Sequence, residues 1–206
     1  MRVCDLGRVL ALGAHPDDVE LGCGGLLQRA EECRVLVASA GERGGDPGVR
    51  LAEAHASAAV LGAELIVLRH QDTRVDPVVL TADVERVLAE FRPALVLVTP
   101  ANDPHQDHAA VHQAAVRAVR DHPCQLLAYV TPSAAPAFGP DWFASLTQEQ
   151  LDRKLQAVRM HASQRRSHQY LADEYIVGMA RYWAMVTRAQ AQYVEPFRLV
   201  SYREAA

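Results

Sequence analysis

Histidine and carboxylate side chains cluster at two places in this chain of 206 residues. The first cluster is A-H-P-D-D at residues 14–18, and the second is H-Q-D-H at residues 105–108. Neutral imidazole and carboxylate oxygen together suit Zn²⁺, and a catalytic zinc site keeps three protein ligands and one open position. His15, Asp18 and His108 would supply these ligands, so the two clusters predict a catalytic metal site.

The same clusters hold further groups that could do chemistry. Neighbouring side chains of an irregular loop point in different directions, so Asp17 can face a water molecule while Asp18 binds the metal. His105 and His108 are three residues apart at an expected helix start, so one imidazole can bind the metal while the other reaches a substrate atom. The pattern therefore provides metal ligands, a base and a second polar group within two short segments.

The two clusters act together only if the fold brings them to one place. Short β-branched and leucine-rich runs alternate with helical patterns, which is typical of βαβ units around a mostly parallel sheet. Ligands of such sheets bind beyond the carboxyl ends of the strands, where both clusters fall. We therefore expect one α/β domain over residues 1–206, with strands at residues 9–13, 35–39, 65–68, 95–99 and 126–130.

Helical patterns fill the segments between these strands. We expect Thr81 to be the N-cap of the third helix and Gly62 to end the second. Proline and small residues at 131–140 predict a surface loop, and the capping-box pattern T-Q-E-Q at 147–150 opens a helix after it. The expected helices are residues 24–33, 49–61, 82–91, 107–120, 148–161 and 171–189, followed by a short tail.

Composition restricts the class of partner. Half of the residues are apolar, 22% are charged, and the net charge is -4, the balance of a globular enzyme. This charge gives no general attraction to nucleic acid or to an anionic membrane, so we expect a small-molecule substrate. The longest apolar runs are too short to span a bilayer. The four cysteines, Cys4, Cys23, Cys33 and Cys124, are scattered without a C-x-x-C pair, so they indicate neither a disulfide framework nor a zinc ribbon. This fits a reducing compartment, and we expect a cytoplasmic location.

The two clusters resemble the motifs of the PIG-L/LmbE superfamily of zinc-dependent N-deacetylases. The first motif of that family reads A-H-P-D-D and the second reads H-x-D-H. The family includes the deacetylases of bacillithiol and mycothiol synthesis. The resemblance covers nearly the whole chain, since it continues through G-E-R-G at 41–44, R-x-x-E at 50–53, L-G at 61–62, H-x-S-Q at 161–164 and Y-x-E-x-F at 193–197.

This resemblance implies roles for individual residues. It implies a Rossmann-like three-layer sandwich with zinc on the three ligands named above. Asp17 would be the general base, and His105 would be the acid or oxyanion stabiliser. Asp107 would tune and orient His105, and Arg50 and Asp72 would contact the sugar.

The implied activity is hydrolysis of the acetamide of an N-acetylglucosaminyl conjugate to a free amine and acetate. Relatives are often homo-oligomers, frequently hexamers, so an oligomer is expected here. Zn²⁺, Fe²⁺ and Co²⁺ accept similar ligands, which leaves the metal open. Gln106 stands where many relatives have proline, and Asp103 stands where the mycothiol enzyme has a substrate-facing tyrosine, which disfavours that substrate.

Other interpretations stay open at this point. A different zinc amidohydrolase acting on a non-sugar acyl-amide would use the same ligands, and a sugar- or nucleotide-binding module could keep the fold without chemistry. The glycines of 22–25 resemble a dinucleotide-binding turn, yet they follow the metal motif and not a strand. His112 lies four residues after His108 and is expected to be structural, while Arg50 and Glu53 could form a simple ion pair.

Overall fold

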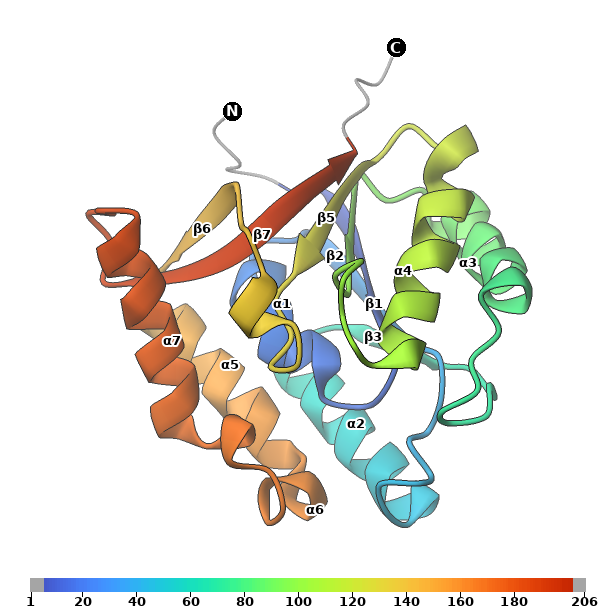
Figure 1. Ribbon diagram of the computed structural model, residues 1–206, viewed down its shortest axis with the longest axis horizontal. Helices are drawn as coiled ribbons and strands as arrows, with labels where there is room; N and C mark the ends of the chain where they lie inside the picture. The colour runs from blue at the N-terminus through green and yellow to red at the C-terminus, as the bar shows by residue number, and fades with distance from the viewer. Residues whose placement is uncertain (1–5, 202–206) are drawn as a thin grey trace.

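A seven-stranded sheet forms the centre of the molecule in the computed structural model, which describes residues 6–201 (Figure 1). The strand order is β3-β2-β1-β4-β5-β7-β6, and the first five strands of this order are parallel. The strand β7 runs antiparallel to both β5 and β6. The strands are β1 (Arg8–Gly13), β2 (Glu32–Val37), β3 (Glu64–Val67), β4 (Leu95–Val98), β5 (Gln125–Tyr129), β6 (Trp142–Leu146) and β7 (Tyr193–Ser201).

Helices cover both faces of this sheet, which confirms the predicted three-layer α/β domain (Figure 1). Along β1, Leu10 and Leu12 enter the core beneath α3 and α4, while Val9 and Ala11 enter the core beneath α1, α2 and α5. Both sets of side chains are fully buried. The helices are α1 (Asp18–Leu27), α2 (Pro47–Leu61), α3 (Pro77–Phe91), α4 (Gln106–Ala118), α5 (Gln148–Met160), α6 (Ala162–Arg165) and α7 (Asp173–Val186).

Local sequence signals set most helix ends. Asp46 caps α2 by accepting a hydrogen bond from the Val49 amide, and Gly62 ends that helix at a φ of 70°, as predicted. The predicted capping box of α5 is present between Thr147 and Gln150. The predicted N-cap of α3 was wrong. That helix begins one turn earlier, after Asp76, which accepts from the Val78 and Val79 amides.

The helix expected at 24–33 was misplaced, because α1 begins within the first motif and β2 has already begun at Glu32. Acidic residues are favourable in a first helical turn, and α1 has two of them there. Its glycines are required by close packing and not by a turn. A Cβ on Gly22 would lie 2.1 Å from the Tyr129 ring, and one on Gly25 would lie 2.5 Å from Leu146.

The sequence did not predict the two antiparallel strands at the sheet edge. Residues 193–201 were expected to be a tail, yet β7 lies between β5 and β6. Glu195 interrupts the apolar residues of β7, and a charged residue is unusual inside a strand. Glu195 is buried and is compensated by Lys154 Nζ at 2.6 Å and by the amides of Gly25 and Leu26. No helix within residues 6–201 has the length and hydropathy that crossing a bilayer requires.

Removing one partner of this buried ion pair should strongly destabilise the protein. Lys154→Met leaves the Glu195 carboxylate buried without its cation, which typically costs about 3–5 kcal/mol. The free energy of unfolding in urea measures the change. Arg153→Met on the exposed face of α5 is the matched control and should stay within about 0.5 kcal/mol of the parent protein. Equal effects of the two substitutions would contradict the role of the pair.

Candidate active site

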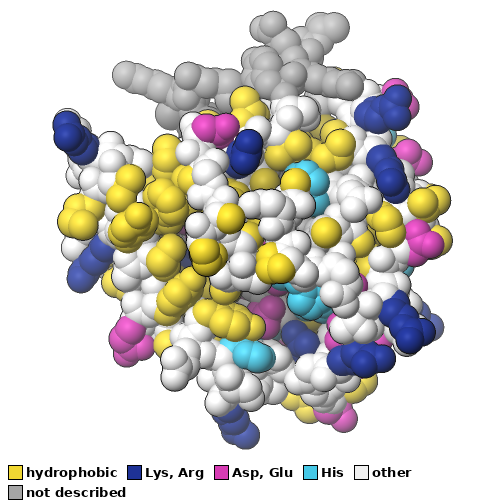
Figure 2. Space-filling view, viewed as in Figure 1, with side chains coloured by type: hydrophobic (Ala, Val, Ile, Leu, Met, Phe, Trp, Pro, Cys, Tyr) yellow, Lys and Arg dark blue, Asp and Glu magenta, His cyan; other side chains and the backbone are white. Residues whose placement is uncertain are grey.

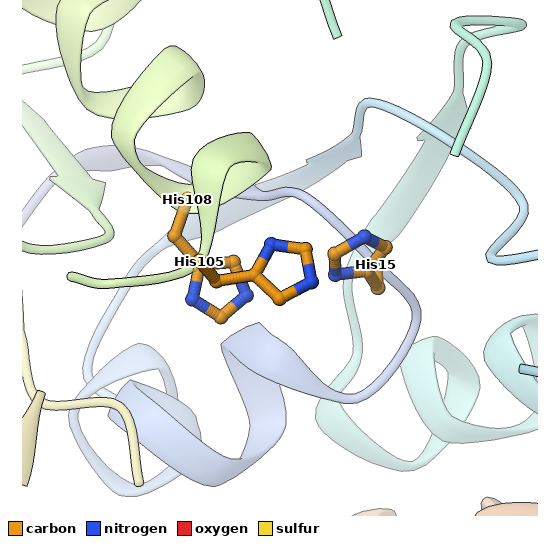
Figure 3. A group of neighbouring side chains, drawn as sticks. All are labelled: His15, His105 and His108. Carbon is orange, nitrogen blue, oxygen red and sulfur yellow. The ribbon is translucent and has the colours of Figure 1, made fainter. Parts of the chain in front are cut away.

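The two histidine clusters meet at the carboxyl edge of the sheet, although they are far apart in sequence. His15 follows β1, His105 is the N-cap of α4, and His108 lies in the first turn of α4. The ring centroids of His15 and His105 are 4.8 Å apart, and those of His105 and His108 are 4.7 Å apart (Figure 3). Figure 2 shows histidine and acidic side chains together near the middle of the viewed face.

The Asp18 carboxylate lies between two of these imidazoles. Its Oδ1 is 3.3 Å from His108 Nε2, and its Oδ2 is 3.8 Å from His15 Nδ1. The backbone amides of Ala14 and His15 also donate to Oδ2, both at 2.9 Å. Burial alone would raise the pKa of Asp18, but His108 and His15 outweigh it and hold the pKa well below its usual value. Asp18 is therefore ionised at neutral pH.

Two carboxylates contact Nε2 of His15, the ring nitrogen that points away from Asp18. Its Nε2 lies 3.2 Å from Asp72 Oδ1 and 3.2 Å from Asp107 Oδ2. Asp107 is fully buried and also accepts hydrogen bonds from the amides of Thr73 at 2.7 Å and Val75 at 3.2 Å. Burial lowers the pKa of His15, but the two carboxylates outweigh it and raise the pKa to about 9. These contacts leave Nδ1 as the nitrogen that faces Asp18.

His108 Nδ1, the ring nitrogen that points away from Asp18, also has a carboxylate partner. His108 Nδ1 lies 2.7 Å from Asp103 Oδ2. Asp103 also accepts from Ser133 Oγ at 2.8 Å, from the His105 amide at 2.9 Å and from Thr131 Oγ1. Burial lowers the pKa of His108, but Asp18 and Asp103 outweigh it and raise the pKa to about 10. Sequence reasoning assigned no such role to Asp103, because nothing in the spacing shows which way its side chain points.

Asp17 lies beside this cluster in a strained backbone conformation. It is the N-cap of α1, and its φ of 109° is in a region that non-glycine residues seldom adopt. Burial is the main cause that raises the pKa of Asp17 to about 7, and the charge of Asp18 adds to it. His161 and Arg50 oppose this rise. A carboxyl group that titrates near neutral pH is suited to general base catalysis.

His105 is placed to donate a hydrogen bond. Its Nδ1 accepts from the Asp107 amide at 3.2 Å, so in the neutral ring the proton lies on Nε2. Burial and the neighbouring His108 and His15 lower the pKa of His105, which keeps the ring neutral. Asp107 was expected to orient His105. The structure places the Asp107 carboxylate on His15 instead, and the Asp107 backbone amide donates to His105.

Arg50 and Asp72 were expected to contact the sugar, yet their polar atoms are directed at the protein. Buried Arg50 donates to the carbonyls of Gly41 at 2.8 Å and Pro16 at 2.9 Å, and its Nη2 is 3.6 Å from Asp17 Oδ2. The second oxygen of Asp72 accepts from the Arg43 amide at 2.9 Å. These contacts hold the site together, and a contact of either residue with substrate stays a prediction.

Two further histidines are held by other parts of the protein. His112 Nδ1 lies 2.7 Å from the Thr99 carbonyl, which ties α4 to the end of β4. His161 is fully buried, and its Nε2 is 3.2 Å from Glu20 Oε1. His161 therefore contacts α1 one turn after Asp17. Both positions agree with packing roles.

The cluster has the chemistry of a site for a divalent cation. His15 Nδ1, Asp18 and His108 Nε2 face one another, and a carboxylate holds the other nitrogen of each imidazole, as in many metal sites. Two other groups bring one ligand atom of each residue within 4.8 Å of the others: His15 with His105 and His108, and His15 with Asp72 and Asp107. Both oxygens of Asp107 already accept from backbone amides, whereas the Ala14 and His15 amides both donate to Asp18 Oδ2 and no amide within residues 6–201 donates to its Oδ1, so the group around Asp18 fits a cation best.

Comparison with known proteins identifies the family of this chain and agrees with its fold. Residues 10–119, more than half of the chain, match the PIG-L family, described as GlcNAc-PI de-N-acetylase. The chain belongs to this family, which confirms the resemblance of its motifs. The Escherichia coli (strain K12) protein called uncharacterized deacetylase YaiS is 34% identical over 168 residues, which cover 75% of this chain and 90% of that protein.

Solved structures share the whole architecture. The conserved protein TT1542 from Thermus thermophilus is 27% identical with a TM-score of 0.81, and the match covers 96% of both chains. The N,N'-diacetylchitobiose deacetylase from Pyrococcus horikoshii is 20% identical with a TM-score of 0.80, covering 94% of this chain and 83% of that one. At that identity the second likeness shows a common fold.

Loss of the carboxylate behind His108 should weaken metal binding. Asp103→Ala removes the group that orients the His108 ring, and such changes typically lower metal affinity about 10- to 100-fold. Competition with a chromophoric chelator measures the affinity for Zn²⁺. Asn102→Ala, at the exposed neighbouring position, should leave the affinity as it is. Unchanged affinity in Asp103→Ala would show that His108 needs no such partner.

Metal binding should release protons at neutral pH. The raised pKa values of about 9 for His15 and about 10 for His108 mean that both rings carry a proton at pH 7 in the metal-free protein. Both must lose it to bind Zn²⁺, so about two protons leave per ion, and the number falls as the pH rises through 9 to 10.

Calorimetric titration with Zn²⁺ in buffers of different ionisation enthalpy counts these protons. His112→Gln is the control, because burial lowers the pKa of His112 and the ring is already neutral. Zinc binding at pH 7 without proton release would contradict the arrangement of carboxylates around the two imidazoles.

Proposed function

We propose that this protein is a metal-dependent N-deacetylase that hydrolyses the acetamide of an N-acetylglucosaminyl conjugate. Membership of the PIG-L family and the deacetylase names of relatives support deacetylation as the general activity. The single observation that carries the proposal is the position of Asp17. A buried carboxyl with a pKa of about 7 lies directly beside a group that can hold a divalent cation.

The residues of the chain divide the reaction between them. A Zn²⁺, Fe²⁺ or Co²⁺ ion held by His15, Asp18 and His108 would polarise the acetamide carbonyl and lower the pKa of a water molecule. Asp17 accepts a proton from the attacking water. The Nε2–H of His105 donates to the oxygen of the amide as negative charge develops on it.

The remaining step returns the proton to the leaving group. The C–N bond of the tetrahedral intermediate breaks, and the proton taken up by Asp17 is transferred to the departing amine. Water and the amide are thereby converted to acetate and a free amino group. The pKa of about 7 suits Asp17 to both transfers, because the carboxyl can accept and return a proton near neutral pH.

The sugar class of the substrate rests on the family and its relatives. The family description names an N-acetylglucosaminyl lipid, and the Pyrococcus horikoshii enzyme is named for diacetylchitobiose. An N-acetylglucosaminyl group is the part that these names share. We further propose a small-molecule substrate, a homo-oligomer and a cytoplasmic location. The location is supported by Cys23 and Cys33, which are buried and form no disulfide within residues 6–201.

Replacement of the base should abolish turnover without loss of the metal. Asp17→Asn keeps the shape of the side chain but removes its basicity, so kcat should fall by about 10²- to 10⁴-fold. Acetate release from N-acetylglucosaminides measures the rate, and elemental analysis measures bound metal. Asp46→Asn, at the exposed N-cap of α2, is the matched control and should keep full activity.

Treatment of the parent protein with a chelator gives the complementary state, in which Asp17 is present and the metal is gone. This treatment should also abolish acetate release, and added Zn²⁺ should restore it. Activity that survives removal of the metal, or full activity in Asp17→Asn, would reject the proposed mechanism.

A further inference from the structure

The H-x-S-Q segment at residues 161–164 has no part in the mechanism above, yet it contacts three elements next to the site. It lies where α5 ends and α6 begins, on the same face of the sheet as α1 and α2 (Figure 1). The Glu53 carboxylate of α2 accepts from the Ser163 amide at 2.8 Å and from the Ser163 hydroxyl at 2.7 Å. Gln164 Nε2 donates to the Gly44 carbonyl at 3.2 Å, and the histidine of the segment faces α1. The segment therefore joins α1, α2 and the loop after β2.

His161 and Glu20 form a buried ion pair between this segment and α1. His161 is 0% exposed, Glu20 is 5% exposed, and His161 Nε2 lies 3.2 Å from Glu20 Oε1. Neither ring nitrogen makes an aligned hydrogen bond within residues 6–201, so opposite charge holds the pair together. Burial lowers the pKa of His161, but the neighbouring carboxylates, Glu20 foremost, outweigh it and raise the pKa, which favours the charged ring.

Glu20 lies in the first turn of α1, and the N-cap of that helix is the strained residue Asp17. The Leu21 amide donates to the Asp17 carbonyl at 3.0 Å, so the turn that carries Glu20 also fixes the backbone after Asp17. On the other side, Arg50 donates to the Pro16 carbonyl at 2.9 Å. A strained backbone of this kind typically costs about 1–3 kcal/mol and persists only where its surroundings hold it. Contacts on both sides therefore keep Asp17 in this conformation.

The Asp17 carboxylate depends on this backbone for its position, because few contacts hold the side chain itself. The neighbouring Asp18 carboxylate accepts from two backbone amides and contacts two imidazoles. The Asp17 carboxylate makes no hydrogen bond within residues 6–201, and its ion-pair partner, Arg50 Nη2, is 3.6 Å away. Loosening of the first turn of α1 would therefore displace Asp17 while other contacts still hold Asp18.

We propose that His161 is a positioning residue for the base Asp17. The charge of His161 holds Glu20, Glu20 fixes the first turn of α1, and this turn keeps Asp17 in its strained conformation beside the metal site. The proposal rests on the proposed function, because His161 acts through the proposed base. His161 is fully buried, so its effect on the reaction needs no contact with the substrate.

A double-mutant cycle with the base tests this role. His161→Gln should lower kcat for acetate release about 10- to 100-fold, because a misplacement of about 1 Å can cost that much, and should leave KM within about twofold. In the Asp17→Asn background the same substitution should change kcat by less than about twofold, because the effects of residues that act as one unit are not additive. Loss of kcat by the same factor in both backgrounds would make His161 a structural residue and overturn the proposal.

Two further variants separate positioning from stability. Lys154→Met breaks the buried ion pair with Glu195, so it destabilises the fold, yet it should keep kcat at a temperature where the protein is folded. Glu20→Met/His161→Leu leaves no buried charge unpaired, so it should fold even if His161→Gln does not. Its kcat should stay low, because flexible apolar side chains hold the turn less firmly than the ion pair does. Full kcat in this double variant would contradict the role of the ion pair.

Hydrogen exchange tests the same role without activity. The Leu21 amide, which donates to the Asp17 carbonyl, should exchange about tenfold faster in His161→Gln, after correction for global unfolding measured on the Leu127 amide of β5. Faster exchange of Leu21 in a protein that releases no acetate would reject the deacetylase and keep the role of His161 in holding Asp17. Exchange of Leu21 that only follows Leu127 would reject the role of His161, whether or not the protein is active.

Discussion

The Asp18 carboxylate held between two imidazoles is the interaction on which the rest of the site depends. Two protonated imidazoles and one carboxylate are stable together at low solvent exposure only because further carboxylates contact the ring nitrogens that point away from Asp18. Asp72 and Asp107 lie behind His15, and Asp103 lies behind His108. This arrangement directs one nitrogen of each ring toward Asp18, where the proposed divalent cation would replace the protons.

The fold supports this concentration of charge by placing it where backbone amides are available. The carboxyl edge of a parallel sheet gathers the loops after β1, β2, β3 and β4, and their amides donate to the carboxylates. Arg50 joins two of these loops through the carbonyls of Gly41 and Pro16. Its guanidinium lies so close to Gly41 that a Cβ there would be 2.0 Å from Nη1, which is why this position is glycine. The strained backbone of Asp17 is held by the same contacts.

Much of this could be predicted from local sequence. The five parallel strands are near-continuous apolar runs, Gly62 stands at the end of α2, and the capping box stands at the start of α5. The antiparallel strands β6 and β7 were missed because β7 carries a glutamate whose compensation comes from Lys154, 41 residues away. The start of α1 was missed because the first motif was expected to form an irregular loop, whereas Asp18 already lies in the first turn of the helix. Only the packing against Tyr129 and Leu146 shows why the glycines of α1 are needed.

The sequence by itself determined which chemistry is present: the histidine and aspartate types, their spacing in two motifs, and the strand ends that carry them. Only the tertiary structure decided which nitrogen of each ring faces Asp18, that Asp107 contacts His15 by its carboxylate, and that Asp103 contacts His108. The physical reason is the range of the interactions. Strand and cap formation depend on residues a few positions apart, whereas the His15–Asp107 contact joins residues 92 positions apart and exists only once the sheet has brought their loops together.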